Sequence, residues 1–454
     1  MRPSTTRARA AWLLGALCLA LGASGCAAGA GSLGGGGRTL TIAIVSNSQM
    51  QDAINLSHEF EKVDPGVNLK FVSLAENEAR AKITASVATG GGEFDVVMIS
   101  NYETAMWAKN GWIVNLQPYM NRTPGYDPHD FLPTLRRALS YRGDMYSAPF
   151  YGESSFLMYN KQMFAQAGLT MPSHPTWPQV AQLAAKLDKN GAYGICLRGD
   201  PGWGEVLAPL DTVINAFGGR WYDPQWNAQL TSKPVQRAVR FYVNLVRKHG
   251  EPGAASTGFQ ECANLMSQGQ TAMWYDATSA VSVLEDPATS NVAGKVGYAP
   301  APTAVKGNDG WLYTWSLAIP TASKNRSDAW KFISWMTSKS YIRNIAQAKG
   351  YGPSHVPPGS RLSTYQLPAY KKAARAYAAP TLSAMNAANQ LKPTVQPVPY
   401  TGVQFLAIPE FQDLGTRVSQ QISAAIAGRE SVSTALQQSQ QYAQTVGDAY
   451  KKGS

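Results

Sequence analysis

The feature that most constrains the fold is an alternation of strand-like and helix-like segments near the N-terminus. Three short apolar runs with β-branched residues have the pattern of strands: residues 39–45, 67–72 and 94–99. Between them, residues 51–63 place apolar side chains at helical spacing, and residues 79–89 are expected to form a second helix. Because strands that alternate with helices form parallel sheets with covered faces, the sequence predicts an α/β fold.

The N-terminus has the features of a secretory signal. Basic residues precede an apolar run at 10–22, which is too short to span a membrane. The residues ASGC at 23–26 place a cysteine after small residues, as in a bacterial lipobox, although Ala23 stands where Leu is usual. We predict a signal peptide over 1–25, a lipid on Cys26 and a flexible tether over 26–37, with secretion without a lipid as the alternative.

Charge and cysteine content exclude several kinds of site. Loss of residues 1–25 removes three arginines and no acidic residue, so the net charge falls from +11 to +8, without the basic blocks that nucleic acids select. Cys196 and Cys262 then remain, and in an oxidising compartment they form either a disulfide or two separate buried thiols. No cysteine or histidine has metal-ligand spacing, so we expect no metal and no other cofactor.

Polar loops follow the first and third expected strands. In open α/β sheets, ligands bind beyond the carboxyl ends of the strands. Residues 46–49 (SNSQ) and 100–102 (SNY) occupy such positions, which makes Asn47 and Asn101 candidate ligand-binding residues. Ordinary helix N-caps explain each of them equally well.

A resemblance to a known family rests on an ordered set of segments. These are EFEKVDPGV at 59–67, FDVV at 94–97, DMYSAP at 144–149, MYNK at 158–161, GQTAMW at 269–274 and WSLAIP at 315–320. In this order they resemble the extracellular solute-binding proteins of carbohydrate ABC importers, a group that includes maltose-binding protein. Three segments are most similar to the sorbitol/mannitol (polyol) binding branch: GICLRGDPGWGE at 194–205, MWYDAT at 273–278 and PVPYTG at 397–402.

The resemblance implies a two-lobe, periplasmic-binding-protein-like fold with a ligand cleft between the lobes. Each lobe is expected to be a mainly parallel sheet flanked by helices, with 38–150 and 297–345 in lobe 1 and 151–296 and 346–454 in lobe 2. Hinge motion would close the lobes over a small polyol or sugar such as sorbitol, mannitol or arabitol. The expected protein is a non-enzymatic monomer, lipid-anchored on the outer face of the cytoplasmic membrane, that serves permease subunits with a separate ATPase.

A polyol site needs carboxylates, amides and arginine for the hydroxyl groups, and aromatic faces for the C–H surface. Glu153 and Asp276 match ligand-contacting positions of the family, with a hinge salt bridge and a helix cap as the respective alternatives. Arg198, Asp200 and Trp203 share a polar loop rich in glycine and proline, which is expected at the cleft. The other candidates are aromatic, with core packing as their alternative: Tyr151, Trp274, Trp311, Trp315 and Tyr351.

Three functions other than polyol transport are compatible with parts of this sequence. A binding protein for a disaccharide or longer sugar would carry the same segments. In an exported glycosidase, two of Glu153, Glu205 and Asp276 would act as the general acid and the nucleophile. Such a pair must stand at a defined distance across the scissile bond, and the sequence does not give that distance. A sensor lipoprotein would use the same closure around a ligand. A serine hydrolase and a nucleotide-binding loop are not indicated, because neither Gly-x-Ser-x-Gly nor a Walker-type motif occurs.

Overall fold

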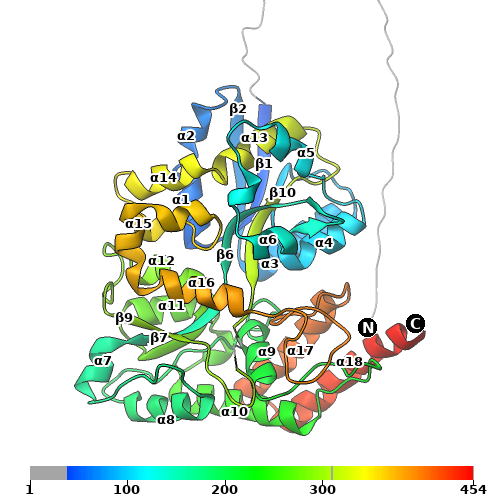
Figure 1. Cartoon of the computed structure of the whole chain (residues 1–454). Coiled ribbons are helices and arrows are strands. Elements are labelled where there is room, and N and C mark those ends of the chain that lie inside the picture. The colour runs from blue at the N-terminus through cyan, green and yellow to red at the C-terminus, as the bar shows by residue number, and fades with distance from the viewer. Residues whose placement is uncertain (1–37, 308–309, 453–454) are drawn as a thin grey trace, which may run out of the picture. The chain divides into compact units, whose positions relative to one another are not determined.

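The computed structural model describes residues 38–307 and 310–452, which form two lobes with one main sheet each (Figure 1). The predicted signal peptide, the tether and Cys26 lie outside the described residues. In the part of the chain that is described, no helix is long and apolar enough to cross a membrane.

Lobe 1 contains a five-stranded mixed sheet in the order β2-β1-β3-β10-β6. Its strands are β1 (Arg38–Val45), β2 (Val67–Leu74), β3 (Val96–Ser100), β6 (Ala148–Glu153) and β10 (Tyr313–Ala318). β1 pairs in parallel with β2 and β3, as the alternating pattern predicted, whereas β10 runs antiparallel to β3 and β6. The apolar side chains of β1 and β3 are buried and form the centre of this lobe's core.

Lobe 2 contains a three-stranded sheet in the order β8-β7-β9, built from β7 (Ser155–Asn160), β8 (Met273–Ala277) and β9 (Val296–Pro300). All three pair antiparallel, so the expected mainly parallel sheet is wrong for this lobe. The reason is that the chain enters the lobe along β7 and returns toward lobe 1 along β8, which places Ser155 opposite Ala277. Three isolated parallel bridges accompany the sheet: Cys196–Trp274, which involves β8, Tyr193–Thr271 and Thr176–Thr303.

The chain crosses between the lobes at Ser154, between β6 and β7, and returns between β9 and β10. β9 therefore belongs to lobe 2, and a lobe boundary at 296/297 cuts the chain one strand too early. Residues near Arg361 also remain with lobe 1, because its guanidinium donates to the carbonyl oxygens of Tyr126 and Thr337. The last passage to lobe 2 therefore follows Arg361 and not residue 346.

Helices surround both sheets, and a short hairpin of β4 (Ser140–Tyr141) and β5 (Asp144–Met145) accompanies lobe 1. The first group of helices belongs to lobe 1: α1 (Ser48–Asn55), α2 (His58–Glu61), α3 (Glu76–Ala88), α4 (Asn101–Lys109), α5 (Gln117–Arg122), α6 (Pro133–Ala138), α13 (Arg326–Met336), α14 (Lys339–Gln347) and α15 (Pro368–Ala373). The expected single helix over 51–63 is split into α1 and α2. α4 begins at a capping box in which Ser100 and Glu103 satisfy each other's backbone donors.

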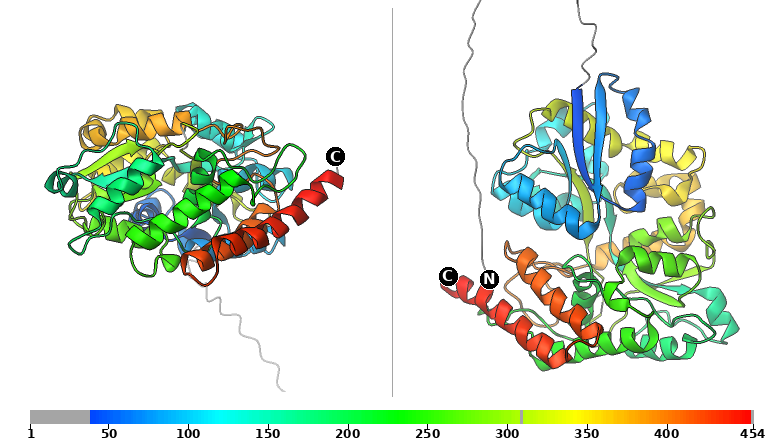
Figure 2. Two further views of the ribbon diagram at one scale, coloured as in Figure 1. Left: turned by 90° about the horizontal axis from the view of Figure 1, so that it is seen from below. Right: turned by 180° about the vertical axis from the view of Figure 1, so that it is seen from behind.

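The second group of helices belongs to lobe 2: α7 (Lys161–Gln166), α8 (Trp177–Leu187), α9 (Leu207–Ala216), α10 (Lys233–His249), α11 (Phe259–Ser267), α12 (Val281–Leu284), α16 (Ala378–Ala387), α17 (Phe411–Ile426) and α18 (Val432–Lys452). α10 buries Val235, Val239, Tyr242 and Val246 on one face, which is the spacing of an amphipathic helix. α17 and α18 pack on this helix, as Figure 2 shows from behind, so the C-terminal helical pattern completes the lobe 2 core.

Candidate functional site

A cavity of about 500 Å³ lies between the lobes, within the size range of small-molecule sites. Lobe 1 contributes the loops that follow β1 and β2, together with side chains of β6 and β10. Lobe 2 contributes residues 198–208, the start of α11 and the segment after β8. The cavity therefore lies at the carboxyl ends of β1 and β2; of the two loops that the sequence indicated, 46–49 lines it and 100–102 does not.

Most of the predicted site residues come together on the wall of this cavity. They are Asn47, Tyr151, Glu153, Arg198, Asp200, Trp203, Trp311 and Trp315. The remaining predicted residues lie elsewhere: Asn101, Trp274, Asp276 and Tyr351.

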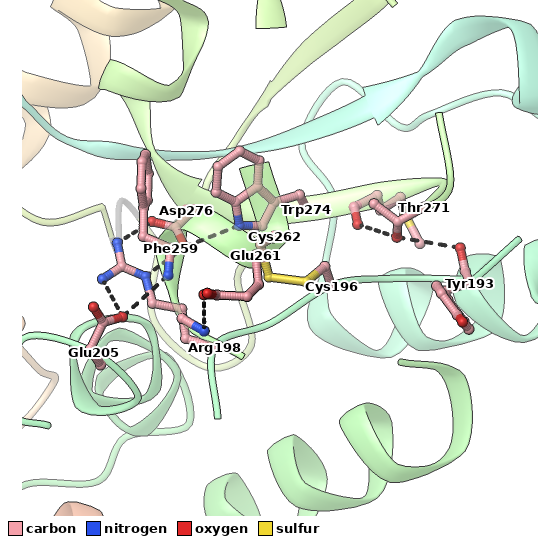
Figure 3. The surroundings of a disulfide bond; sticks show 12 residues. Tyr193, Cys196, Arg198, Glu205, Phe259, Glu261, Cys262, Thr271, Trp274 and Asp276 are labelled. Carbon is pink, nitrogen blue, oxygen red and sulfur yellow. Dashed lines mark hydrogen bonds and ion pairs between the residues drawn. A yellow bond between two sulfur atoms is a disulfide. The ribbon is translucent and has the colours of Figure 1, made fainter. Parts of the chain in front are cut away.

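Asp276 is bonded to Arg198 (Figure 3) and does not line the cavity, so its predicted ligand contact is corrected to a supporting role. Its carboxylate is fully buried and accepts from Arg198 Nε at 2.8 Å and Nη2 at 2.5 Å. It also accepts a hydrogen bond from the indole Nε1 of Trp274 at 3.0 Å. Trp274 is fully buried beside it and is therefore a core residue. The sequence located the end of β8 but not the direction in which its side chains point.

Asn101 and Tyr351 have other surroundings. Asn101 Oδ1 accepts from the backbone N–H of Thr314 at 3.1 Å, which holds β10 against α4. It lines a second cavity of about 360 Å³ on another part of the boundary between the lobes. Tyr351 packs edge-on against His355, with ring centroids 5.2 Å apart. Neither side chain reaches the main cavity.

Arg198 is the centre of the charged network in lobe 2. Besides its two bonds to Asp276, its Nη1 donates to the carbonyl oxygen of Gly204 at 2.8 Å and to Glu205 Oε2 at 3.4 Å. Burial raises the pKa of Glu205 to about 8, although the Arg198 charge acts in the opposite direction. The network therefore fixes Arg198 and presents a weakly acidic carboxyl group to the cavity.

A disulfide between Cys196 and Cys262 lies next to this network (Figure 3). It joins the segment that leads to Arg198 with α11, whose first turn carries Phe259 on the cavity wall. Of the two alternatives that the sequence left open, the structure thus has the bonded pair. The bond connects two separate parts of the lobe 2 wall.

Arg80 is a cavity residue that the sequence did not predict. Its Nε and Nη2 donate to Glu76 Oε1 at 3.0 and 2.7 Å, and its Nη1 donates to Glu103 at 3.1 Å. The guanidinium carbon lies 4.1 Å from the ring centroid of Trp203 in lobe 2 and 4.6 Å from that of Trp315 in lobe 1. Arg80 is therefore stacked between aromatic rings of both lobes.

Glu153 stands at the first crossing between the lobes. It is almost fully buried, and Ser279 Oγ from lobe 2 donates a hydrogen bond to its Oε2. Burial raises the pKa of Glu153 to about 7. Beside it, the hydroxyl of Tyr151 accepts from Asn47 Nδ2 at 3.0 Å, while Asn47 Oδ1 caps α1 by accepting from Met50. Asn47 is therefore both the N-cap of α1 and a residue of the cavity wall.

The lobes also contact each other on either side of the cavity. Gln49 Nε2 in lobe 1 donates to Ser282 Oγ in lobe 2 at 2.7 Å. Asn77 Nδ2 in lobe 1 donates to the carbonyl oxygen of Pro201 in lobe 2 at 2.9 Å. The structure is therefore a closed arrangement in which residues of both lobes surround the cavity.

Several lining residues were missed for different reasons. Glu76 and Asn77 follow β2 as Asn47 follows β1. Because ligands bind beyond the carboxyl ends of parallel strands, this position would have indicated both residues. Gln404 lies in an irregular C-terminal segment and carries no local signal. Among residues 38–307 and 310–452, no group of three or more His, Cys, Asp or Glu side chains is arranged to hold a metal ion.

Comparison with known proteins gives consistent matches along the chain. The family described as bacterial extracellular solute-binding protein matches residues 44–342. A mannitol-binding protein of Pseudomonas aeruginosa is 43% identical over 410 residues, which cover 89% of this chain and 92% of that protein. A crystal structure of an ABC transporter solute-binding protein from Agrobacterium vitis with bound D-mannitol has 44% identity and a TM-score of 0.86, covering 92% of this chain and 99% of that one.

A more distant structure supports the fold alone. A solute-binding protein of Agrobacterium radiobacter in complex with ribitol has 24% identity and a TM-score of 0.78, covering 90% of this chain and 99% of that one.

Proposed function

Because this chain belongs to the family of bacterial extracellular solute-binding proteins, we propose that it captures a small linear polyol such as D-mannitol for an ABC importer. Members of this family and the similar proteins bind solutes for transporters and are not enzymes. The family also implies a location outside the cytoplasm. The ligand is therefore bound and released unchanged.

The observation that carries the proposal is the combination of carboxylates and indole rings on one cavity wall. Glu153 and Glu205 provide buried oxygen atoms, and Trp203, Trp311 and Trp315 provide apolar faces. An alditol has hydroxyl groups along a flexible carbon chain, so it offers both hydrogen bonds and C–H surface to such a wall. The similar mannitol-binding protein of Pseudomonas aeruginosa and the similar structure with bound D-mannitol support the same ligand class.

The charge of the cavity favours a neutral ligand. Its lining includes two guanidinium groups, Arg80 and Arg198, and both are already paired with carboxylates. Five carboxyl groups line the same cavity: Glu76, Glu153, Asp200, Glu205 and Glu261. Because both guanidinium groups are already paired with carboxylates, a ligand anion would meet no excess of positive charge on this wall, so sugar acids and sugar phosphates are expected to bind more weakly than alditols.

Capture is proposed to use hinge motion at the crossings between the lobes. The crossing at Ser154 and the passage from β9 to β10 connect two separately packed sheets. The polar contacts across the cavity, such as Gln49 to Ser282, involve few atoms and can be exchanged for water when the lobes separate. Ligand bound between the lobes would then stabilise the closed form by its contacts with both.

The attachment to the membrane and the partners are part of the same proposal. The ASGC sequence at 23–26 supports removal of residues 1–25 and a lipid on Cys26, with residues 26–37 as a tether. The loaded protein would dock as a monomer on two permease subunits, and a separate subunit would hydrolyse ATP.

Isothermal titration calorimetry on residues 38–454 tests the ligand class. The panel comprises D-mannitol, sorbitol, arabitol, xylitol, glucose, maltose, trehalose and D-gluconate. The proposal predicts binding of one or more alditols at micromolar concentration, with sugars and gluconate weaker. Binding of a disaccharide alone would replace the polyol by a longer sugar, and no binding across the panel would contradict the proposal.

A pair of variants assigns that binding to the cavity. At pH 8, above the raised pKa of Glu153, Glu153→Gln is expected to weaken alditol binding about tenfold or more, because a buried carboxylate is a stronger acceptor than an amide. Glu93→Gln is the matched control, since Glu93 is exposed and lies outside the cavity. Equal affinities for the two variants would remove Glu153 from the proposed site.

A further inference from the structure

The longest stretch of the chain without an acidic residue runs from residue 329 to residue 409. It contains nine Lys or Arg residues and no Asp or Glu. Three of the nine, Lys331, Lys339 and Arg361, form ion pairs with carboxylates of lobe 1. The other six are exposed, and none of them has an ion-pair partner among residues 38–307 and 310–452. This part of the surface therefore carries positive charge that no direct partner neutralises.

Five of these six side chains lie on neighbouring elements of the fold. They are Arg343 of α14, Lys349 after it, Lys371 and Lys372 of α15, and Arg375 of the 3₁₀ turn that follows. Both helices pack on the same two short turns, Pro353–His355 and Leu362–Gln366, and Figure 1 shows the helices side by side. Leu362, in the second of these turns, is 44% exposed. We call these five cations and Leu362 the basic face.

The acidic side chains that contact this region have other partners. Asp52 and Asp286 face His355, at 2.8 and 3.8 Å. Asp130 accepts a hydrogen bond from the hydroxyl of Ser363 at 2.6 Å. The charge of the basic face is therefore available to a partner outside the chain.

The basic face has no pocket. Neither the main cavity nor the second one is lined by any of its residues. A small anion is normally held in a concave site, whereas cations beside an exposed apolar side chain suit a broad anionic surface. These features favour an extended partner.

The predicted membrane anchor lies within reach of this face. The first described residue is Arg38, whose Nε lies 2.9 Å from Asp328 Oδ2 in the first turn of α13. α13 has 11 residues, which makes it about 16 Å long, and α14 begins three residues after α13 ends. Residues 26–37 span about 40 Å when fully extended. A lipid on Cys26 would therefore keep α14 near the membrane surface.

On the basis of the lipid anchor in the proposed function, we propose that the basic face binds the anionic headgroups of the membrane to which the protein is tethered. Its Lys and Arg side chains donate to phosphate oxygens, and each cation near an anionic leaflet adds to the binding. Leu362 contacts the apolar boundary below the headgroups. The contact gives the tethered protein one preferred orientation on the membrane.

The chain offers a matched control for this proposal. α10 also carries exposed cations without an ion-pair partner in the described part of the chain, and Figure 1 shows this helix at the end of lobe 2 that is remote from lobe 1. The two triple variants are Lys371→Gln, Lys372→Gln, Arg375→Gln on the basic face and Arg237→Gln, Arg240→Gln, Lys248→Gln on α10. Both lose three positive charges, so a difference between them reports the place of the charge.

The experiment is sedimentation of residues 38–454 with vesicles, so that binding does not depend on the lipid anchor. Vesicles of phosphatidylglycerol and phosphatidylcholine in about equal parts are compared with vesicles of phosphatidylcholine alone. The salt concentration is about 0.1 M, where the screening length is about 10 Å. The wild type should sediment with the anionic vesicles only. The basic-face variant should bind them about tenfold more weakly, and the α10 variant about twofold at most.

Three results would overturn the inference. The first is no binding of the wild type to anionic vesicles, which would leave an acidic protein surface as the partner of this face. The second is equal binding to neutral vesicles, and the third is an equal loss in the two variants, which would reduce the effect to net charge. Circular dichroism checks that both variants are folded.

Calorimetry with D-mannitol separates this inference from the proposed ligand. None of the six replaced residues lines the main cavity, so both variants should bind D-mannitol as the wild type does. A wild type that binds no alditol would contradict the proposed ligand and leave the vesicle result standing. A wild type that binds alditols but no anionic vesicles would contradict the inference alone.

Discussion

Arg80 and Arg198 are both buried guanidinium groups on the cavity wall, yet their partners differ. Arg198 in lobe 2 is bonded bidentately to Asp276 of the same lobe. Arg80 in lobe 1 is paired with carboxylates of its own lobe, but one of the three aromatic rings beside its guanidinium, Trp203, comes from lobe 2. The first arginine completes one lobe, and the second lies where the lobes meet.

The comparison separates two kinds of energetic role at one site. Breaking the network of Arg198 is expected to damage lobe 2 itself, whether or not the lobes are closed. Disturbing the contacts of Arg80 across the cavity is expected to affect closure and ligand binding, while each lobe stays folded. Stability and affinity should therefore respond separately to substitutions on the two sides of the cavity.

The largest expected effect is that of Asp276→Ala. The variant leaves the Arg198 charge buried without its main partner, so the free energy of unfolding should fall by about 3–5 kcal/mol. Urea unfolding of the ligand-free protein, followed by tryptophan fluorescence, measures it. Asp188→Ala is a control from the same lobe, because its partner His249 is partly exposed, and it should cost about 1 kcal/mol at most. Similar midpoints for the two variants would contradict the assigned role of Asp276.

Removal of the disulfide should have the next largest effect. The bond joins residues separated by 66 positions, so the double variant Cys196→Ser, Cys262→Ser should lose about 2–4 kcal/mol. Thermal unfolding with and without a reductant measures this. Reduction should lower the melting temperature of the wild type to that of the double variant, and it should leave the double variant unchanged. A wild type that is insensitive to a reductant under unfolding conditions would show that the bond does not form.

Gly204→Ala probes the side where the lobes meet. A Cβ at Gly204 would lie 2.3 Å from Glu76 Oε1 and 3.0 Å from Arg80 Nε, both in lobe 1. Closure should become unfavourable, and alditol affinity should fall about tenfold while the unfolding of the ligand-free protein stays unchanged. Gly307→Ala is the control, since a Cβ there meets nothing within 4 Å. A loss of stability in ligand-free Gly204→Ala would mean that this contact does not depend on closure.

The smallest expected effect is a dependence of affinity on pH through His355. Its Nδ1 lies 2.8 Å from Asp52 Oδ2 in lobe 1, and its Nε2 lies 3.8 Å from Asp286 Oδ1 in lobe 2. The hydrogen bond to Asp52, followed by the charges of both carboxylates, raises the pKa of His355 against the opposing effect of burial. The charged imidazolium therefore favours the closed form at low pH, and this contribution is lost as the pH rises through the raised pKa.

Binding titrations from pH 6 to pH 8 in the wild type and in His355→Gln test this effect. Glu153 and Glu205 also titrate near this range, so the difference between the two proteins isolates the histidine. Between pH 6 and pH 8, the affinity of the wild type should fall by a factor about three times larger than the affinity of His355→Gln. Parallel pH profiles would show that His355 does not couple the lobes.

The sequence predicted the three parallel strands of the lobe 1 sheet because they are short apolar runs between helices, but it did not predict the antiparallel pairing of β10 with β3 and β6. It failed for lobe 2, where the antiparallel pairing of β7 with β8 joins segments more than a hundred residues apart. The lobe boundary was misplaced for the same reason. Local pattern indicates that residues 296–300 form a strand but not which sheet that strand joins.

For the candidate site too, local sequence pattern indicated some residues and not those that depend on packing of distant segments. Glu153, Arg198 and Trp203 were predicted from segments with a recognisable order along the chain, and they lie on the cavity wall. Asp276 was assigned to the ligand because it matches a ligand-contacting position of the family, but its carboxylate is buried against Arg198. Arg80 and Gln404 reach the cavity only through packing of distant segments, so their roles were not visible in the sequence.

A crystal structure of residues 38–454 grown with D-mannitol tests the central claim most directly. The account predicts one mannitol molecule in the cavity between the lobes, with hydroxyl groups within hydrogen-bond distance of Glu153, and with Asp276 bonded to Arg198 and not to the ligand. Mannitol bound at another place, or Asp276 in direct contact with it, would contradict the account.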